Sequence, residues 1–288
     1  MRIDAHHHVW TVSRGDYGWL ERAPDTIRRD FGMADLAHIL ARHGIGATIL
    51  VQAAPTAAET AFLLETARRA DVVAGVVGWV DLLAADATER IGRLADDALL
   101  VGLRPMVQDI ADDEFLLDPS LAPALQTMAE RGLVFDALVL PRHLSRLLVL
   151  ADRHPDLSIV IDHAAKPFIR DGLLDPWRAD MAALAARANV TCKLSGLVTE
   201  AAAGWSPGDL APYVAHILSV FGPERLIWGS DWPVVNLAGG YDAWRAASET
   251  LLSSLDDSAR KAIFGGNAAR TYLAARGRIP PTPGEQPC

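Results

Sequence analysis

Cysteine is almost absent from this chain, whose 288 residues include only Cys192 and Cys288. Two cysteines cannot build a disulfide framework, which agrees with a reducing compartment. The sequence also lacks an apolar run of the roughly 18 residues that a membrane helix needs. Its N-terminus has no basic region followed by an apolar segment and a small-residue cleavage site. We therefore expect a cytoplasmic enzyme or binding protein without a membrane partner.

Positive charge is also in short supply. The chain has 27 Lys and Arg residues against 36 Asp and Glu residues, and its net charge is −9. The basic residues do not cluster in any segment. Because binding to a phosphate backbone requires a basic field, this composition argues against a nucleic-acid partner. A small molecule is the expected ligand, and the sequence leaves the oligomeric state open.

Hydrophobic residues make up half of the chain, which is ample for a large core. Eight runs rich in β-branched residues alternate with stretches of helical periodicity. The runs are RIDAHHHVW, GATILVQAA, VVAGVVGWVDL, LLVGLRPMV, LVFDALVL, LSIVIDHA, VTCKLSGL and RLIWGSDWP. Eight strand–helix units in about 270 residues predict a single-domain (β/α)₈ barrel, the TIM barrel. A doubly wound open sheet is the alternative, which the number of units and the lack of a glycine-rich phosphate loop disfavour.

The barrel is assigned to residues 1–276. Within it, segment 13–30 is too long and irregular for an ordinary loop between a strand and a helix, and we interpret it as an elaboration over the barrel mouth. Residues 277–288, GRIPPTPGEQPC, are rich in Pro and Gly and contain little to bury. We expect them to form a flexible C-terminal tail.

Three consecutive histidines lie in the first apolar run. Side chains alternate between the two faces of a strand, so His6 and His8 should share one face. His7 should point to the helical layer, on the same face as Ile3 and Ala5. Active sites of such barrels lie at the carboxyl ends of the strands, and we expect His6 and His8 to face that site.

Two further strand ends carry polar groups suited to the same site. The sixth run ends in IDHAAKP with His163, and the eighth ends in WGSDWP with Asp231. We predict that both side chains meet His6 and His8 at the barrel mouth. Three imidazoles and a carboxylate can hold a divalent cation such as Zn²⁺, or can orient a water molecule without a metal. Each residue alone is typical of a hydrogen-bonded core group, but the four together favour a functional site.

An ordered series of motifs resembles the amidohydrolase superfamily over roughly residues 1–275. The first run resembles its HxH strand, and IDHAAKP, CKLSGL, GSDWPV and FGGNAARTY resemble successive signatures of its amidohydrolase-2 branch. Within that branch, RGDYGWL, GLRPMVQD and LPRHL resemble the sugar lactonases of the L-fuconolactonase and L-rhamnonolactonase type. The resemblance implies a hydrolase that opens a small aldonolactone, such as L-fucono- or L-rhamnono-lactone, to its sugar acid.

The resemblance also implies the position of a metal centre. The matching ligand positions are His6, His8, His163 and Asp231. Many family members add a lysine or an acidic ligand near strands four and five to bridge a second metal, but here those strands supply Arg104, Gln108 and Asp136. One divalent cation is therefore expected, with Zn²⁺ as the first choice. Related lactonases work without a tightly required metal, so the expected cation is not essential to the predicted chemistry.

Lactone hydrolysis needs an activated water and a polarised carbonyl. We assign Asp231 as the general base on the water and then as the proton donor to the departing ring alkoxide. His163, with His6 and His8, would polarise the carbonyl or orient the water. Arg104 would hydrogen-bond the developing oxyanion or a substrate hydroxyl, and a structural ion pair inside the barrel is its equally weighted alternative.

Aromatic, imidazole and amide side chains near the strand ends are candidates for substrate recognition, because they offer flat apolar faces beside hydrogen-bonding groups. These candidates are Tyr17, Trp19, Trp79, Gln108, His143, Trp232 and Asn236. The roles of Arg142 and of segment 13–30 stay open. For Lys193 we favour a structural pair with a carboxylate over a substrate contact.

Two other kinds of function remain as alternatives. A metal-dependent non-oxidative decarboxylase, or a dicarboxylate lactonase of the same branch, would need several arginines at the mouth to bind carboxylates. The sequence offers Arg104, Arg142 and Arg14 there, which favours a neutral lactone. A non-catalytic binding barrel is the least favoured, because all four candidate catalytic groups are present.

Overall fold

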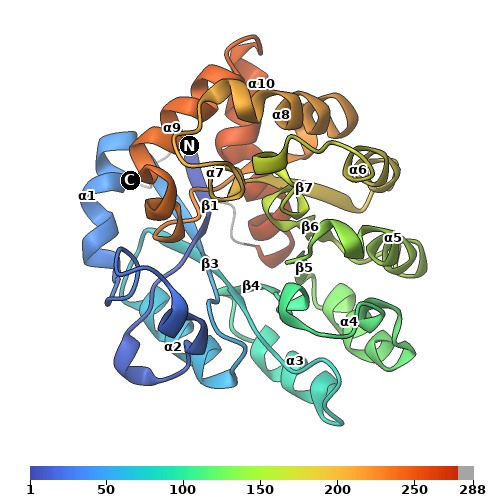
Figure 1. Ribbon diagram of the computed structural model, residues 1–288. Helices are drawn as coiled ribbons and strands as arrows, with labels where there is room; N and C mark the ends of the chain where they lie inside the picture. Colours follow the sequence, from blue (N-terminus) through green and yellow to red (C-terminus); the bar gives the residue numbers. More distant parts are fainter. Residues whose placement is uncertain (278–288) are drawn as a thin grey trace, which may run out of the picture.

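Eight parallel strands follow one another in chain order around the barrel of the computed structural model, which describes residues 1–277 (Figure 1). They are β1 Arg2–His7, β2 Ile45–Val51, β3 Val73–Gly78, β4 Leu100–Leu103, β5 Val134–Ala137, β6 Ile159–Ile161, β7 Val190–Leu194 and β8 Leu226–Trp228. A parallel bridge between His7 and Trp232 joins the first strand to the segment after the last. The predicted (β/α)₈ barrel is confirmed, and this closure rules out the open sheet.

Helices cover the outside of the barrel (Figure 1). They are α1 Met33–His43, α2 Ala57–Arg68, α3 Ala87–Ala95, α4 Ala122–Glu130, α5 Leu144–Arg153, α6 Trp177–Ala185, α7 Leu197–Glu200, α8 Pro207–Phe221, α9 Gly240–Leu251 and α10 Asp257–Lys261. Across residues 1–277, no helix has the length and apolar character required to cross a membrane.

Local signals set the ends of these helices. Gly44 ends α1 in the left-handed conformation, with φ of 62°, where glycine avoids the strain that a side chain would add. Thr56 begins α2, because its side chain accepts a hydrogen bond from the Glu59 backbone at 3.0 Å. Because the strands are parallel, their carboxyl ends all lie at the same rim of the barrel.

Small aliphatic side chains fill the interior of the barrel. Seven strands contribute to this buried cluster, which also includes Tyr272 and Leu273 from the C-terminal segment. Ile3 and Ala5 belong to it, so the prediction that they face the helical layer together with His7 is wrong. The expected tail, residues 277–288, lies outside the described residues apart from Gly277.

The first strand departs from strict alternation, which explains this correction. Its pairing with β2 shifts register between Asp4 and His7. The Asp4 carboxylate accepts a hydrogen bond from the His6 backbone at 3.2 Å, within the irregular stretch. His6 consequently faces inward directly after Ala5. His7 lies on the opposite face, where its Nε2 is 2.9 Å from Thr48 Oγ1.

Two backbone hydrogen bonds between the residues that flank segment 13–30 hold its two ends together. Trp10 and Phe31 exchange two backbone hydrogen bonds, of 2.9 and 3.0 Å. Between them the chain forms short 3₁₀ turns, and the turn Gly18–Arg22 carries Trp19. The Trp19 indole donates to the Ala53 carbonyl at 2.8 Å, which fixes this turn against the end of β2.

The seam between β1 and the end of β8 is tightly packed. Asp4 also accepts a hydrogen bond from the Ser230 backbone at 2.9 Å. The Asp231 backbone donates to the His6 carbonyl at 2.8 Å, and the His8 backbone donates to the Trp232 carbonyl at 2.7 Å. A Cβ on Gly229 would lie 2.6 Å from the Cβ of His6. Only a glycine leaves room for this approach.

We predict that Gly229→Ala destabilises the barrel, because the added methyl group must push His6 away from β8. Overpacking of this kind costs about 1–3 kcal/mol in the free energy of unfolding. The matched control is Gly92→Ala in α3, where a Cβ meets no other atom within 4 Å, and which should gain up to about 1 kcal/mol. Urea unfolding followed by tryptophan fluorescence measures both. Equal midpoints for the two variants would contradict the tight seam.

Candidate active site

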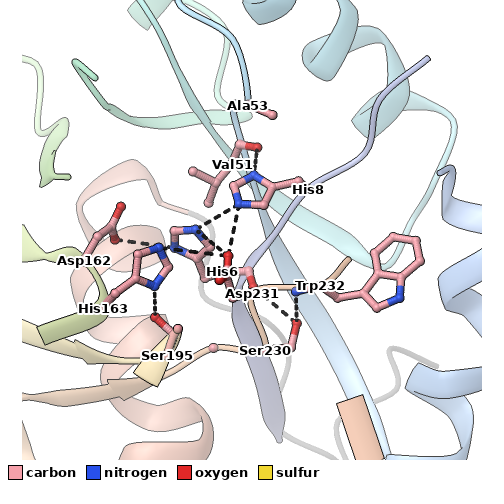
Figure 2. Close-up of polar contacts among 12 residues, drawn as sticks. His6, His8, Val51, Ala53, Asp162, His163, Ser195, Ser230, Asp231 and Trp232 are labelled. Carbon is pink, nitrogen blue, oxygen red and sulfur yellow. Dashed lines mark hydrogen bonds and ion pairs between the residues drawn. The ribbon is translucent and has the colours of Figure 1, made fainter. Parts of the chain in front are cut away.

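The four side chains predicted to form a site meet at the carboxyl ends of the strands (Figure 2). The Nε2 atoms of His6 and His8 are 3.2 Å apart. Asp231 Oδ1 lies 3.3 Å from His8 Nε2, 3.8 Å from His6 Nε2 and 4.0 Å from His163 Nε2. All four residues are buried. One carboxylate oxygen therefore stands among three imidazole nitrogens.

His163 and Asp231 adopt a backbone conformation that is unfavourable for residues other than glycine. Their φ angles are 53° and 59°, and every residue from His163 to Lys166 has a positive φ. The left-handed conformation costs roughly 1–2 kcal/mol per residue. Two hydrogen bonds hold the turn, from Lys166 N to His163 O at 2.9 Å and from the Trp177 indole to Ala164 O at 2.7 Å. Strain of this kind is typical of functional sites.

Hydrogen bonds to the far sides of the rings orient two of the imidazoles. His8 Nδ1 is 2.8 Å from the Val51 carbonyl, and His163 Nδ1 is 2.8 Å from Ser195 Oγ. A carbonyl can only accept, so His8 donates from Nδ1–H to Val51 and turns Nε2 toward Asp231. This arrangement is typical of metal-ligating histidines, whose other ring nitrogen is bound by the protein.

A buried ion-pair network lies beneath the histidines. The Lys193 ammonium is 2.7 Å from Asp136 Oδ2 and 2.7 Å from Asp162 Oδ1. The Tyr272 hydroxyl donates to the other oxygen of Asp136 at 2.8 Å. His6 Nδ1 lies 3.4 Å from Asp162 and 3.2 Å from the ammonium. Lys193 thus forms the carboxylate pair that its sequence context favoured.

Arg104 forms the structural ion pair considered for it and also lines the cavity. Its Nη1 is 3.2 Å from Asp162 Oδ2, and its Nη2 donates to the Gln52 carbonyl. The same Nη1 lies 3.4 Å from His6 Nε2. Arg104 is also one of the residues that line the cavity above the histidines. It is therefore an ion-pair partner inside the barrel whose side chain also reaches the site.

Burial and neighbouring charges set the protonation of the site. Burial lowers the pKa of His163 to about 4 and that of His6 well below its usual value. Burial alone would raise the pKa of Asp231, but His163 and the hydrogen bond with His8 outweigh it and lower that pKa. Burial of Asp162 is likewise outweighed by Lys193, which holds the pKa of this carboxyl well below its usual value. At neutral pH these two imidazoles are uncharged and both carboxylates are ionised.

The charges in and under the site favour a bound cation. Three buried carboxylates, those of Asp136, Asp162 and Asp231, face two buried cations, Lys193 and Arg104. Lys193 and Arg104 pair with Asp136 and Asp162, whereas the close partners of Asp231 are the imidazoles of the three histidines. A divalent cation there would compensate a charge that is costly to bury alone.

The ligand spacing also fits a single metal ion. His6, His163 and Asp231 each offer a ligand atom within 4.8 Å of the others, and His8 Nε2 lies beside this group, 3.2 Å from His6 Nε2 and 3.3 Å from Asp231 Oδ1. Ligands about 2.1 Å from a tetrahedral Zn²⁺ are about 3.4 Å apart. The separations of 3.2 to 4.0 Å observed here are close to that value. Ligation through His6 Nε2 requires His6 Nδ1–H to donate to Asp162, which is within reach.

A cavity of about 210 Å³ opens above the histidines. This is smaller than the roughly 300–1,000 Å³ of pockets that take drug-sized ligands, so the cavity suits a single small ring. Its lining residues are His8, Trp19, Ala53, Arg104, Met106, Gln108, Asp109, Leu138, His163, Lys166, Asp231 and Val234. The lining combines apolar walls with charged and amide groups, a mixture that suits a polyhydroxylated ligand.

Two of the predicted recognition residues, Trp19 and Gln108, line this cavity within the described part of the chain. Trp19 is 38 % exposed, so its ring is available to a ligand. Trp79 is placed elsewhere, in a separate cavity beside α2 and α3, because it follows β3 on the outward face. Its backbone is held there by the Thr60 hydroxyl, which bonds both its N–H and its carbonyl.

His143 and Tyr17 are also placed away from the cavity lining. His143 is fully buried at the start of α5, where Nδ1 accepts a hydrogen bond from the Leu140 backbone at 3.1 Å and Nε2 lies 3.2 Å from Asp113. The Tyr17 hydroxyl donates to Glu59 at 2.6 Å. Both side chains are committed to partners within the protein, so the prediction of a substrate contact is not supported by their positions.

Trp232 and Asn236 follow the same pattern. The Trp232 ring is buried and packs edge-on against Phe31, with ring centroids 5.3 Å apart. Asn236 lies in the 3₁₀ segment Val234–Ala238, in which Val234 is the residue that faces the cavity. Trp232 therefore packs against Phe31, the residue that follows segment 13–30, and is absent from the residues that line the cavity in the described part of the chain.

Sequence reasoning missed the contribution of two residues next to His163. Alternation along a strand places Asp162 on the face opposite His163, but the left-handed turn brings both into the site. The same turn delivers Lys166 to the cavity wall. The motif IDHAAKP contains all three residues, yet no propensity rule predicts four consecutive positive φ angles without glycine.

Comparison with known proteins agrees with this geometry. The family model described as amidohydrolase matches residues 3–273. The chain is 49% identical over 280 residues to the L-fucono-1,5-lactonase of Burkholderia ambifaria, covering 96% of this chain and 97% of that protein. It is 39% identical to the L-fucono-1,5-lactonase of Burkholderia multivorans, covering 94% and 96% respectively.

A solved structure shares the whole fold. An amidohydrolase from Burkholderia multivorans, crystallised with bound zinc, superposes with a TM-score of 0.90 at 39% identity, covering 94% of this chain and 99% of that one. Because the family model and these relatives all extend over nearly the full barrel, the chain belongs to the amidohydrolase family.

Proposed function

We propose that this protein hydrolyses a small sugar lactone to its sugar acid, with L-fucono-1,5-lactone as the first substrate to test. The observation that carries the proposal is the ionised Asp231 carboxylate, which faces a small cavity from among three histidines. Two relatives that match nearly the whole chain are named L-fucono-1,5-lactonases, which supports this substrate class.

The reaction can be derived from the residues around the cavity. Asp231 is ionised, so it can accept a proton from a water molecule in the cavity as that water attacks the lactone carbonyl. The ring C–O bond then breaks, and Asp231 returns the proton to the departing alkoxide. His8 and His163, held on their far sides by Val51 and Ser195, orient the water and the carbonyl.

Arg104 supplies fixed positive charge to the same cavity. Its guanidinium is always protonated and can hydrogen-bond the oxyanion that develops on the carbonyl oxygen. Its bonds to Asp162 and Gln52 hold the group in place before substrate arrives. Such preorganised donors contribute about 3–4 kcal/mol to transition-state stabilisation in comparable sites.

A divalent cation, for which we propose Zn²⁺, would be held by His6, His8, His163 and Asp231. When bound, it would supply a Lewis acid that polarises the carbonyl and makes water more acidic. The fit rests on the spacing of the four ligand atoms and on the surplus negative charge of the site.

Decarboxylation and dicarboxylate hydrolysis are less well supported. Both need several cations to bind substrate carboxylates. Arg142 pairs with Asp113 outside the cavity, and Arg14 pairs with Asp16. Among residues 1–277, Arg104 and Lys166 are the cationic side chains that line the cavity. A neutral lactone suits this lining better than a dianionic acid.

A cytoplasmic location remains part of the proposal. It rests on the scarcity of cysteine and on the buried thiol of Cys192, which is free. A soluble sugar lactone would be available in that compartment.

We predict that Asp231→Asn abolishes lactone hydrolysis while the fold is retained. The amide has nearly the size of the carboxylate but cannot accept the proton of water. Loss of a positioned general base lowers kcat/KM by about 10²–10⁴-fold. Asp257→Asn on the exposed end of α10 is the matched control and should keep wild-type activity.

The measurement is kcat/KM for L-fucono-1,5-lactone, with circular dichroism to verify folding. If the Asp231→Asn protein kept more than about a tenth of wild-type activity, the loss of transition-state stabilisation would be below about 1.4 kcal/mol. That loss is too small for a general base, and the proposed role of Asp231 would have to be abandoned.

We predict that the protein, equilibrated with zinc, binds one equivalent per chain. His163→Asn should weaken this binding by more than about 10-fold, because it removes a ligand. His7→Asn, on the opposite face of the same strand as His6, should bind zinc as the wild type does. Metal analysis of the purified proteins after dialysis gives the stoichiometry. Two equivalents in the wild type, or unchanged binding in His163→Asn, would rule out this ligand set.

A further inference from the structure

A second cage of cation ligands lies directly beneath the proposed metal site. His6, Asp136 and Asp162 each offer a ligand atom, the three atoms lie within 4.8 Å of one another, and all three residues are buried. Two carboxylate oxygens and an imidazole nitrogen form a ligand set that divalent cations use in proteins. The lactonase chemistry derived above assigns no step to this cage.

The cage already contains a positive charge. Lys193, from β7, is completely buried and places its Nζ 2.7 Å from Asp136 Oδ2 and 2.7 Å from Asp162 Oδ1. His6 Nδ1 is 3.2 Å from the same atom. An ammonium is a compact charge with three donors, so it can satisfy several oxygens at once, as a bound ion does.

The two carboxylates are held independently of the lysine. Asp136 uses its other oxygen to accept a hydrogen bond from Tyr272 at 2.8 Å. Asp162 uses its other oxygen to pair with Arg104 at 3.2 Å. Each carboxylate therefore turns one oxygen to a fixed protein donor and the other to Nζ.

We propose that Asp136 and Asp162, beside His6, form an inner cation site whose resident cation is the ammonium of Lys193. The ammonium lies among groups that could otherwise hold a metal ion, and it helps to keep Asp162 in place to accept from His6 Nδ1–H. The outer site is the proposed metal site of His6, His8, His163 and Asp231. The inference deepens the proposed function and rests on it only for the role of this outer site.

Removing the lysine side chain tests the proposal. Lys193→Ala deletes three carbons and the ammonium, which together correspond to propylammonium. Breaking a buried pair of this kind should lower the melting temperature by about 10 °C. Propylammonium chloride should then bind the vacated cage and raise the melting temperature of this variant by about 5 °C at 100 times its dissociation constant.

Three controls separate charge from volume. 1-Propanol is about as large as propylammonium but uncharged, so it tests the effect of filling the volume. Sodium chloride at the same ionic strength tests the effect of salt alone. Lys193→Met fills the same volume with an uncharged chain, so its melting temperature should not respond to propylammonium. The wild type should not respond either, because its cage is full.

The outcomes are decisive in both directions. A rise in melting temperature that is specific to Lys193→Ala and to propylammonium supports the inner site. No rise, or an equal rise with propanol or salt, overturns it. If Lys193→Ala does not fold alone, the refolding yield with propylammonium against propanol is the readout, with the same two outcomes. Stability is measured throughout, so failure of the lactonase proposal would not alter the result.

Discussion

The hydrogen bonds between the first strand and the segment after the last strand are the constraint on which the site depends. Asp4 binds the backbone of both His6 and Ser230, and His6 in turn accepts from the Asp231 backbone. Closing the ring therefore also aligns His6 and Asp231, two side chains of the proposed site. The register shift in β1 contributes to the same arrangement, because it turns His6 inward directly after Ala5. A regular strand would place His6 among the helices.

Charge is divided among three groups of residues at the site. Lys193 and Arg104 form fully buried ion pairs with Asp136 and Asp162. The imidazoles of His6 and His163 are neutral, because burial disfavours their protonated forms. Asp231 stands beside the histidines and lines the cavity. This division leaves an ionised carboxylate at the place where we propose that water is deprotonated.

Much of this arrangement can be predicted from the sequence, and the rest depends on backbone conformations that a sequence does not reveal. Periodicity located all eight strands, and the polar residues at three strand ends are brought together as expected. Strict alternation was wrong for Ile3 and Ala5, because register shifts are set by tertiary hydrogen bonds such as that of Asp4. Most of the predicted recognition residues pack elsewhere, since an aromatic ring near a strand end is equally suited to the space between barrel and helices. Trp79 and Trp232 show this directly.

The identity of the reaction is tested most directly by one comparison of products. Proton release from L-fucono-1,5-lactone and related aldonolactones is measured beside carbon dioxide release from aromatic carboxylic acids, with and without a strong chelator. The proposed mechanism, with Asp231 as general base, predicts proton release from a lactone with kcat/KM of about 10⁴ M⁻¹ s⁻¹ or more and no carbon dioxide. Carbon dioxide release, or no turnover of any lactone, would contradict the account.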